Sequence, residues 1–347
     1  MFEIKAGGDI DNKKLSKNKN EQYKYPVYAN ALQNNGLYGY SDIYKISGET
    51  ITVTGRGDVG HAIARKENYY PIVRLLILKP IVKQDVDFWA NAINNTRIFV
   101  ESTGVPQLTA PQLAKIKIYY PSLPEQEKIA AFLTLIDKKI EKQKELVELL
   151  KKYKRGLLSQ VFSQKLRFKD NNGNDYPSWE EKYIQDVCSI TTGKGNTQDK
   201  EENGVYPFYV RSPIVEKSNK YIFDGEAVLT VGDGVGTGKV FHYVNGKFNF
   251  HQRVYKMSNF SGINGRYFYY YFSTHFYDRV KRMTAKTSVD SVRMDMIAKM
   301  PIFIPTNAEQ DKIINLLTNI ENIFLKNKNL LLLLQECKKG LLQQMFI

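Results

Sequence analysis

The stretch PSLPEQEKI at residues 121–129 returns later in the chain as PTNAEQDKI at residues 305–313. The similarity continues without a gap, and residues 121–162 match residues 305–346 at 19 of 42 positions. The regions upstream also correspond more weakly, because YPVY before the first copy matches YPFY before the second, and GRG matches GDG. Such a repeat indicates that one structural unit has been duplicated. The sequence therefore predicts the order domain, helix, domain, helix.

Both copies have the pattern of a long helix. Apolar residues recur at alternating steps of four and three, which is typical of a coiled-coil seam. The seam comprises Ile129, Leu133, Ile136, Ile140, Val147, Leu150, Leu157 and Val161 in the first copy, and Ile313, Leu317, Ile320, Phe324, Leu331, Leu334, Leu341 and Met345 in the second. Each copy also opens with the pattern of a capping box, Ser122 to Glu125 and Thr306 to Glu309.

Polar residues interrupt the seam at the same two steps in both copies. They are Gln143 and Lys154 in the first copy, and Asn327 and Lys338 in the second. Matching interruptions favour pairing of the two helices with each other, since polar seam residues fix register. The alternative is that each is one helix of an ordinary bundle. Gly156 and its counterpart Gly340 are expected to kink or end the helices.

The remaining regions, 1–120 and 163–304, are rich in Tyr, Phe, Gly and Asn and contain short apolar or alternating runs. They predict mixed, mainly antiparallel strands, with helices near 87–94 and 264–282. The fold class is therefore α+β, with two mixed-β domains (1–120 and 163–304) separated by conserved helices at 121–162 and 305–347. The second domain has a lead-in at 176–187 without a counterpart in the first domain. We expect either that the N-terminus is trimmed or that something else supplies that strand.

The order of elements favours antiparallel helices. A helix of 38 residues is about 57 Å long, and parallel pairing would require the second domain to carry the chain back along that whole length. Antiparallel pairing instead relates the two halves by a pseudo-two-fold axis. Two-fold DNA-binding proteins contact half-sites about 34–36 Å apart, or multiples of that distance. The sequence thus suggests a spacer holding two domains on a bipartite site.

Composition agrees with a nucleic-acid partner. The 347 residues carry a formal charge of +14, with a pI near 9.4, and such an excess favours a polyanion. Each domain carries five more basic than acidic residues. Two cysteines fit a reducing compartment, and no apolar run is long enough to span a bilayer. We expect a cytoplasmic protein that does not bind membranes.

The repeated pattern Pro-x-x-x-Glu-Gln-x-Lys-Ile, leading into a helix that ends Lys-x-Gly-Leu-Leu-x-Gln-x-Phe, resembles the conserved regions of type I restriction–modification specificity subunits. The two intervening regions are similar to the target recognition domains of that family, including a strand followed by a Gly-rich loop. The resemblance covers nearly the whole chain. It is carried mainly by the helical repeats.

This resemblance implies a non-catalytic subunit that binds double-stranded DNA. Each recognition domain would read one half of a split, asymmetric sequence. Two modification (methyltransferase) subunits would dock against the chain, and restriction subunits would join for cleavage. S-adenosylmethionine, ATP and Mg²⁺ are expected on those partners, and no cofactor on this chain.

Motifs for chemistry on the chain itself are weak. Gly55, Gly57 and Gly60 follow a strand with the spacing of a dinucleotide-binding loop, but no clear helix follows. A structural turn is the favoured interpretation, a loop approaching DNA the second, and nucleotide binding the least favoured. The four histidines lack metal-binding spacing, and no metal site is expected.

Candidate DNA contacts are polar residues in the loops of the two domains. Arg and Lys can bridge guanine acceptors, Asn and Gln can pair with adenine, and all of them can hold phosphates. The candidates are Asn30, Gln33, Arg56, His61 and Gln107 in the first domain, and Arg211, Lys239, Lys286, Ser288 and Arg293 in the second. The aromatic run at 267–272 is interpreted as helix core in preference to a platform for stacking bases.

Three functions remain open from the residues. The first is the specificity subunit of a type I or related bipartite-site restriction–methylation system. The second is a coiled-coil scaffold that binds nucleic acid without sequence specificity. The third, a nucleotide-dependent enzyme, depends on the weak glycine loop alone.

Overall fold

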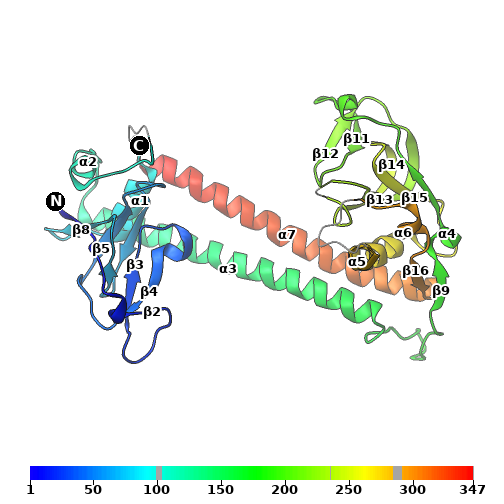
Figure 1. Cartoon of the computed structure of the whole chain (residues 1–347), viewed down its shortest axis with the longest axis horizontal. Helices are drawn as coiled ribbons and strands as arrows, with labels where there is room; N and C mark the ends of the chain where they lie inside the picture. Colours follow the sequence, from blue (N-terminus) through cyan, green and yellow to red (C-terminus); the bar gives the residue numbers. More distant parts are fainter. Residues whose placement is uncertain (99–103, 235, 284–290, 347) are drawn as a thin grey trace. The chain divides into compact units, whose positions relative to one another are not determined.

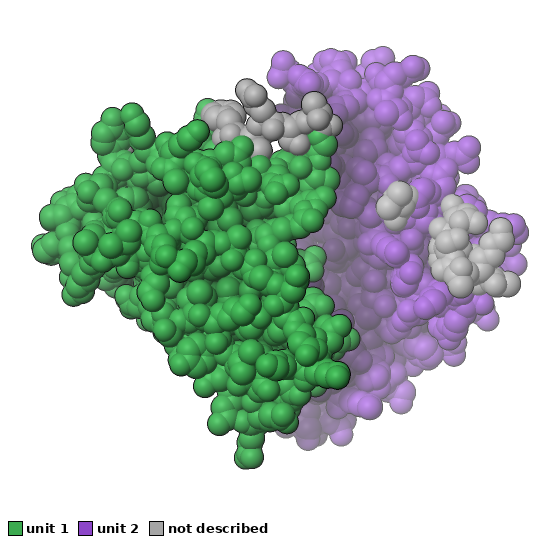
Figure 2. Space-filling view, turned by 60° about the vertical axis from the view of Figure 1, so that its left-hand side comes forward, with its two compact units in different colours: residues 1–145, 329–347 green, residues 146–328 purple. Residues whose placement is uncertain are grey.

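The structure is a computed structural model and describes residues 1–98, 104–234, 236–283 and 291–346. The chain forms two compact units, shown in Figures 1 and 2. Unit 1 consists of Met1–Glu145 and Asn329–Ile347, and unit 2 consists of Leu146–Lys328. Each unit therefore combines one mixed α+β domain with part of both long helices.

The two repeated segments form the long helices α3 (Leu123–Phe162) and α7 (Asn307–Met345), as their apolar spacing predicted. A stripe of buried side chains follows the predicted seam. It comprises Leu133, Ile140, Val147, Leu157 and Val161 in α3, and Ile313, Leu317 and Ile320 in α7. Most of the stability of such helices comes from packing this face, because isolated helices are marginal in water.

The helices run in opposite directions wherever they meet within a unit. In unit 2, Val161 near the end of α3 shares a core with Ile313 near the start of α7. In unit 1, Ala130 near the start of α3 shares a core with Phe346, just beyond the end of α7. This confirms the antiparallel pairing predicted from the sequence (Figure 1).

Two of the predicted seam interruptions are lysines that form ion pairs between the helices. In unit 2, Lys154 Nζ lies 2.5 Å from Glu321 Oε1; in unit 1, Lys338 Nζ lies 2.5 Å from Asp137 Oδ1. The alignment that places Pro121 on Pro305 also places Lys154 on Lys338 and Asp137 on Glu321. The duplication has therefore preserved a contact between the helices as well as a sequence.

The expectation that Gly156 and Gly340 kink or end the helices is wrong. Helix α3 continues for six residues beyond Gly156, and α7 continues for five beyond Gly340. A glycine in a helix interior costs about 1 kcal/mol relative to alanine. Burial of Leu157 and Val161 on the following turn outweighs that cost, since a buried large apolar side chain contributes about 1.5–3 kcal/mol.

The described residues of unit 1 form two four-stranded sheets and two short helices, besides the unit's parts of α3 and α7. The first sheet has the order β1 (Phe2–Ala6), β8 (Leu75–Pro80), β5 (Thr50–Thr54) and β6 (Ala62–Arg65). The second sheet has the order β2 (Leu15–Ser16), β4 (Leu37–Ser41), β3 (Tyr25–Tyr28) and β7 (Tyr70–Pro71). The helices are α1 (Val86–Asn95) and α2 (Ala110–Ala114), with 3-10 turns η1 (Asn12–Lys14) and η2 (Gln33–Gly36).

Helix α1 packs on the first sheet of unit 1. The sequence starts this helix at Asp85, whose side chain accepts a hydrogen bond from Phe88 N. The apolar face of α1 then buries Phe88 and Ile93 in one core with Ile51 and Leu78 of the sheet. Strand β5 is buried at every residue, as expected for a central strand with a helix covering one face.

In the described part of unit 2 there are a six-stranded sheet, a two-stranded sheet and three helices, besides the unit's parts of α3 and α7. The larger sheet has the order β10 (Ser189–Thr192), β15 (Val254–Ser258), β13 (Phe223–Val231), β14 (Phe241–Phe250), β11 (Tyr206–Tyr209) and β12 (Val215–Ser218). The smaller pairs β16 (Pro301–Ile304) with β9 (Glu180–Tyr183). The helices are α4 (Ile184–Val187), α5 (Gly265–Met283) and α6 (Met294–Ala298), with a 3-10 turn η3 (Thr197–Asp199).

Helix α5 carries the aromatic run at 267–272. Four of its rings, those of Tyr267, Phe268, Tyr271 and Phe272, belong to the core of unit 2 and are at most 4% exposed. This confirms the interpretation as helix core, because rings buried to this extent cannot stack on a base. Stacking between Phe268 and Phe272, one turn apart, adds to the packing.

The two domains share one strand order. The antiparallel array β1-β8-β5-β6 of unit 1 has its counterpart in β10-β15-β13-β14 of unit 2, followed in each case by a helix that packs on it. A parallel pairing also recurs, since β3 pairs with β7 as β11 pairs with the end of β14. The weak sequence correspondence upstream of the helical repeats therefore reflects a structural duplication.

A glutamine in the first turn of each long helix ties that helix to its domain. Gln126 Oε1 accepts a hydrogen bond from Asp85 N (3.3 Å), just before α1. Gln310 Oε1 accepts one from Asn264 N (2.7 Å), just before α5. In both cases the amide nitrogen donates to the carbonyl oxygen of the proline five residues earlier, at 2.9 and 3.0 Å.

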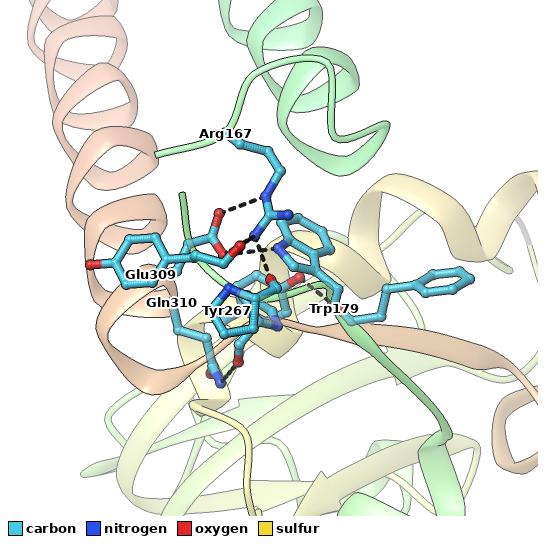
Figure 3. Close-up of polar contacts among 9 residues, drawn as sticks. Arg167, Trp179, Tyr267, Glu309 and Gln310 are labelled. Atoms are coloured by element: carbon cyan, nitrogen blue, oxygen red, sulfur yellow. Dashed lines mark hydrogen bonds and ion pairs between the residues drawn. The ribbon is translucent and has the colours of Figure 1, made fainter. Parts of the chain in front are cut away.

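The preceding glutamate behaves differently in the two units. Glu309 is fully buried and accepts hydrogen bonds from Arg167 Nε (3.1 Å), Arg167 Nη2 (2.8 Å) and Trp179 Nε1 (3.0 Å), as Figure 3 shows. Its counterpart Glu125 is exposed. The sequence predicted that both carboxylates cap their helices. In α7 the carboxylate instead joins the helix to the lead-in of the second domain.

Candidate nucleic-acid interface

In unit 1, three connections meet at Gly55, directly after β5, and two of them carry predicted DNA contacts. Gly55 N donates a hydrogen bond to Arg74 O (3.1 Å) in the connection between β7 and β8. Gly55 O accepts one from Leu108 N (2.8 Å), in the loop before α2. A Cβ atom at position 55 would lie 2.6 Å from Arg74 O, so only glycine allows this approach.

Asn30 adds a fourth connection, the one that follows β3. Its Oδ1 accepts hydrogen bonds from Gly55 N (2.6 Å) and Arg56 N (3.1 Å), and its Nδ2 donates to Arg56 O (2.7 Å). The amide therefore shapes the loop that presents Arg56. Gln33 is exposed further along the same connection, in η2.

Arg56 and Gln107 lie opposite each other in an isolated antiparallel bridge, and Gln107 is exposed. His61 lies at the far end of the same turn, where its backbone N donates to Thr54 Oγ1 (2.9 Å). Burial lowers the pKa of the His61 imidazole, and the nearby Arg65 guanidinium lowers it further.

The glycine pattern of this turn closes a β-hairpin. Gly57 and Gly60 have φ values of 73° and 85°, which glycine adopts without strain. Strand β6 follows at Ala62, so the helix that a dinucleotide-binding loop requires is absent at this point of the described chain. The structural-turn interpretation is confirmed, and nucleotide binding by this loop is wrong.

Unit 2 repeats the arrangement around Gly232, directly after β13. Gly232 N donates to Arg253 O (2.8 Å), and Val292 N donates to Gly232 O (2.7 Å). The next residue, Asp233, forms an isolated bridge with Ser291, as Arg56 does with Gln107. The alignment of the helical repeats, extended upstream, places Gln107 on Ser291.

Asp233 lies between two exposed arginines. Its Oδ1 is 3.7 Å from Arg211 Nη1, and its Oδ2 is 3.6 Å from Arg253 Nε. Oδ1 is buried without a hydrogen-bond partner among the described atoms. Burial, and then the positive charge of Arg211, lower the pKa of the nearby His251. These groups line an open cleft of about 540 Å³, together with Asn196, Thr197, Gln198 and Gln252.

Two other predicted contacts of the second domain, Lys239 and Arg293, do not line this cleft. Lys239 is exposed, and its ammonium group lies 5.1 Å from the ring of Tyr277 in α5. Arg293 is exposed at the start of α6, two residues beyond Ser291. Lys286 and Ser288 lie outside the residues that the structure describes.

One pair of arginines was not predicted from the sequence. Arg74 and Arg253 occupy equivalent positions in the two domains. The carbonyl oxygen of each accepts a hydrogen bond from the backbone N of the glycine that follows the central strand, Gly55 after β5 and Gly232 after β13. Both side chains are exposed. The sequence contains the equivalence of the two arginines, since Ile72-Val73-Arg74-Leu75 corresponds to His251-Gln252-Arg253-Val254. These two segments can be aligned only once the strand registers are known.

Among residues 1–98, 104–234, 236–283 and 291–346, no group of three or more His, Cys, Asp or Glu side chains is arranged to hold a metal ion. Within the same residues, no helix has the length and apolar character to cross a membrane.

These features define a class of protein: a duplicated protein with two related α+β domains, an antiparallel helix pair, and the same set of converging loops in each domain. The sequence profile of the type I restriction modification DNA specificity domain matches residues 1–151 and 177–335. The chain belongs to this family.

Related proteins agree with this assignment. A type I specificity subunit of Mycoplasma pneumoniae is 34% identical over 119 residues, covering 34% of this chain and 33% of the relative. The EcoDI specificity subunit of Escherichia coli is 25% identical over 151 residues, covering 42% and 32%. These matches span about a third of each relative's length. The crystal structure of a type I S subunit from M. genitalium has the same fold, with a TM-score of 0.73 at 16% identity over 100% of this chain and 94% of that one.

Proposed function

We propose that this chain is the DNA-specificity subunit of a type I restriction–modification complex and that it has no catalytic role of its own. The observation that carries the proposal is the duplicated set of loops in a chain of this family, with exposed arginines at equivalent positions. Each domain would read one half of a bipartite sequence in double-stranded DNA, and the helices would set the spacing.

The loops offer the groups that such reading requires. Arginine can bridge the O6 and N7 acceptors of guanine, and a carboxylate can accept from the amino group of cytosine. In the first domain we assign DNA contact to Arg56, His61, Gln107, Gln33 and Arg74, with Asn30 holding the loop. In the second we assign it to Arg211, Asp233, Arg253, Lys239 and Arg293, together with Lys286 and Ser288.

The helix pair would bind the partner subunits. Leu146 and Leu149 of α3 and their counterparts Leu330 and Leu333 of α7 are all exposed. Exposed apolar side chains at equivalent places in a duplicated chain fit two copies of one partner. We assign these places to two modification subunits, which would bind S-adenosylmethionine, with restriction subunits using ATP and Mg²⁺.

Methylome sequencing tests the proposal. Cells that express the modification subunit with and without this chain are compared, and a bipartite methylated motif is expected only when the chain is present. If the chain is a non-specific scaffold, no new motif appears, and the proposal fails. A catalytically inactive modification subunit serves as the control for background methylation.

A domain exchange tests which half of the motif each domain reads. Replacing residues 163–304 with the corresponding domain of another family member should change one half of the methylated motif and leave the other half unchanged. A change in both halves would contradict independent reading by the two domains.

A further inference from the structure

Three connections of unit 2 each bring one charged side chain to the open cleft at Asp233. Arg211 follows β11, Asp233 follows β13, and Arg253 directly precedes β15. The side chain of Asp233 is 28% exposed, and those of Arg211 and Arg253 are 52% and 63% exposed. All three side chains are therefore accessible to a ligand that enters the cleft.

The equivalent positions of unit 1 carry different groups. The counterpart of Asp233 is Arg56, since each follows the glycine that ends the central strand. The counterpart of Arg211 is Asn30, since each is the second residue after the matching strand, β11 or β3. The third position is an arginine in both units. The two domains thus present different hydrogen-bonding groups from the same scaffold.

The backbone of Arg253 is held on both sides. Its N donates a hydrogen bond to His251 Nδ1 (3.0 Å), and its carbonyl oxygen accepts one from Gly232 N (2.8 Å). His251 is buried, and its Nδ1 accepts as the nitrogen of a neutral imidazole. Because the backbone is already fixed, binding through the guanidinium orders only a side chain, which keeps the entropic cost of binding low.

The carboxylate of Asp233 keeps hydrogen-bonding capacity. Its oxygens lie 3.7 Å from Arg211 Nη1 and 3.6 Å from Arg253 Nε, and both distances are too long for hydrogen bonds. Oδ1 has no hydrogen-bond partner among the described atoms. The two guanidinium groups therefore offset the negative charge of the carboxylate, so that it can approach the phosphates of DNA and still accept a hydrogen bond.

A guanine–cytosine pair offers the groups that this arrangement can bind. Guanine presents N7 and O6 as acceptors for one arginine, and cytosine presents its N4 amino group to a carboxylate. O6 and N4 are hydrogen-bonded to each other across the pair and lie about 3 Å apart. Arg253 Nε and Asp233 Oδ2 are separated by a similar distance, 3.6 Å. One guanidinium and its neighbouring carboxylate can thus reach both bases of one pair.

Other DNA groups fit this arrangement less well. A phosphate would be repelled by the Asp233 carboxylate. In an adenine–thymine pair, the N6 amino group of adenine stands beside N7, so that an arginine loses one of its two acceptors. The combination of an arginine with a carboxylate therefore favours guanine–cytosine.

We propose that the second domain reads a guanine–cytosine pair in its half-site. Arg253 bridges N7 and O6 of guanine, and Asp233 accepts a hydrogen bond from N4 of the paired cytosine. Arg211 is a positioning residue that offsets the charge of the carboxylate. The inference rests on the proposed function, because it names bases within the half-site assigned to this domain.

DNA with single modified bases tests both contacts on the chain assembled with its modification subunits. Methylome sequencing gives the motif, and exchange of residues 163–304 identifies the half read by the second domain. Each guanine of that half is replaced by 7-deazaguanine, which lacks the N7 acceptor. Each cytosine is replaced by N4-methylcytosine, in which a methyl group takes the place of the N4 hydrogen in the major groove. At one and the same base pair, each modification should weaken binding about tenfold in fluorescence anisotropy.

Two variants assign the contacts to their residues. Arg253→Lys keeps the positive charge but loses the bidentate geometry, so 7-deazaguanine should weaken its binding by less than about twofold. Asp233→Ala removes the acceptor, so N4-methylcytosine should weaken its binding by less than about twofold. Asp224→Ala is the matched control, because Asp224 is an exposed aspartate near the opposite end of β13. This control should keep the full sensitivity to both modifications.

Failure of this inference is distinguishable from failure of the proposed function. If no bipartite methylated motif appears with the unchanged chain, the proposed function fails, and the base assignment fails with it. If a motif appears but no base pair of its second half is sensitive to both modifications, only the base assignment is overturned. The same holds if the sensitivity persists in Arg253→Lys and Asp233→Ala.

Discussion

The Nζ atom of Lys154 lies 2.5 Å from Oε1 of Glu321 on the facing helix, and the two side chains are 25% and 24% exposed. The contact recurs at Lys338 and Asp137 of unit 1. A lysine in an apolar seam reduces the packing gain but favours the one register in which it meets a carboxylate. In each unit, the same kind of pair therefore selects the antiparallel register.

Charge reversal tests this register. Lys154→Glu and Glu321→Lys alone should each lower the free energy of unfolding by about 1 kcal/mol or more, because each places two like charges together in a half-buried site. The double variant should recover most of the loss. Urea denaturation of the four proteins measures this coupling. If the free energy of unfolding of the double variant falls by the sum of the two single decreases, the two residues do not act as a pair.

Glu309 and Glu125 offer a comparison within one chain. Glu309→Gln leaves the Arg167 guanidinium without its carboxylate and should lower the free energy of unfolding by about 2–4 kcal/mol. Glu125→Gln, at the equivalent but exposed position, should change it by less than about 0.5 kcal/mol. Fluorescence of Trp179, which contacts Glu309, follows the unfolding of unit 2. An equal decrease in the free energy of unfolding in the two variants would contradict an effect of the difference in burial between Glu309 and Glu125.

Substitutions at the equivalent arginines distinguish the two halves of the proposed DNA site. Arg74→Ala should weaken binding to the intact DNA site. The same substitution should have a smaller effect on DNA whose first half-site is already altered. Arg253→Ala should behave in the same way with respect to the second half-site. A lost base contact costs about 1–3 kcal/mol for the intact site. A lost phosphate contact weakens binding to all sequences alike and reduces the salt dependence. Fluorescence anisotropy with the assembled complex measures both, with exposed Arg155→Ala on α3 as the control.

Stability should fall in acid because histidines are buried in their neutral form. Burial lowers the pKa of His242 and His275 below the usual value of 6.5. As the pH falls, the unfolded state therefore binds more protons than the folded state. The free energy of unfolding is largest above about pH 7 and decreases as the pH drops through 6.5. The ring of His242 packs against that of Tyr209 at a tilt of 55°, and its Nε2 has no hydrogen-bond partner among the described atoms.

His242→Phe isolates one of these groups. The variant keeps an aromatic ring beside Tyr209 but binds no proton, so it should lose less stability than the unchanged chain between about pH 7.5 and about pH 5.5. Urea denaturation at several pH values gives the slope. An unchanged slope would mean that His242 contributes nothing to the acid sensitivity.

The fold was predictable where the repeat is strong. The spacing of Leu133, Ile140 and Val147 has the period of a packed helix, and this period can be read without knowledge of any partner. The effect of Gly156 could not be read in the same way, because the packing of neighbouring residues outweighs the local preference of glycine.

The candidate site was predictable only in part. Gly55 and Arg56 follow a recognisable strand, and their loop was identified. Arg74 was missed because it follows the two-residue strand β7 and has a φ of 71°, which apolar periodicity does not reveal. The role of Asn30 in holding the loop depends on hydrogen bonds across 25 and 26 residues, which local sequence does not specify.

The side-chain amides of Gln126 and Gln310 each accept a hydrogen bond from a main-chain nitrogen of the domain and donate one to the carbonyl oxygen of the preceding proline. These two hydrogen bonds depend on the path of the backbone and not on the side chains at positions 85 and 264. The contacts of Glu309 differ, because they require the side chains of Arg167 and Trp179. The first unit is therefore joined to its long helix at this point by a contact that tolerates sequence change, whereas the second unit adds one that does not.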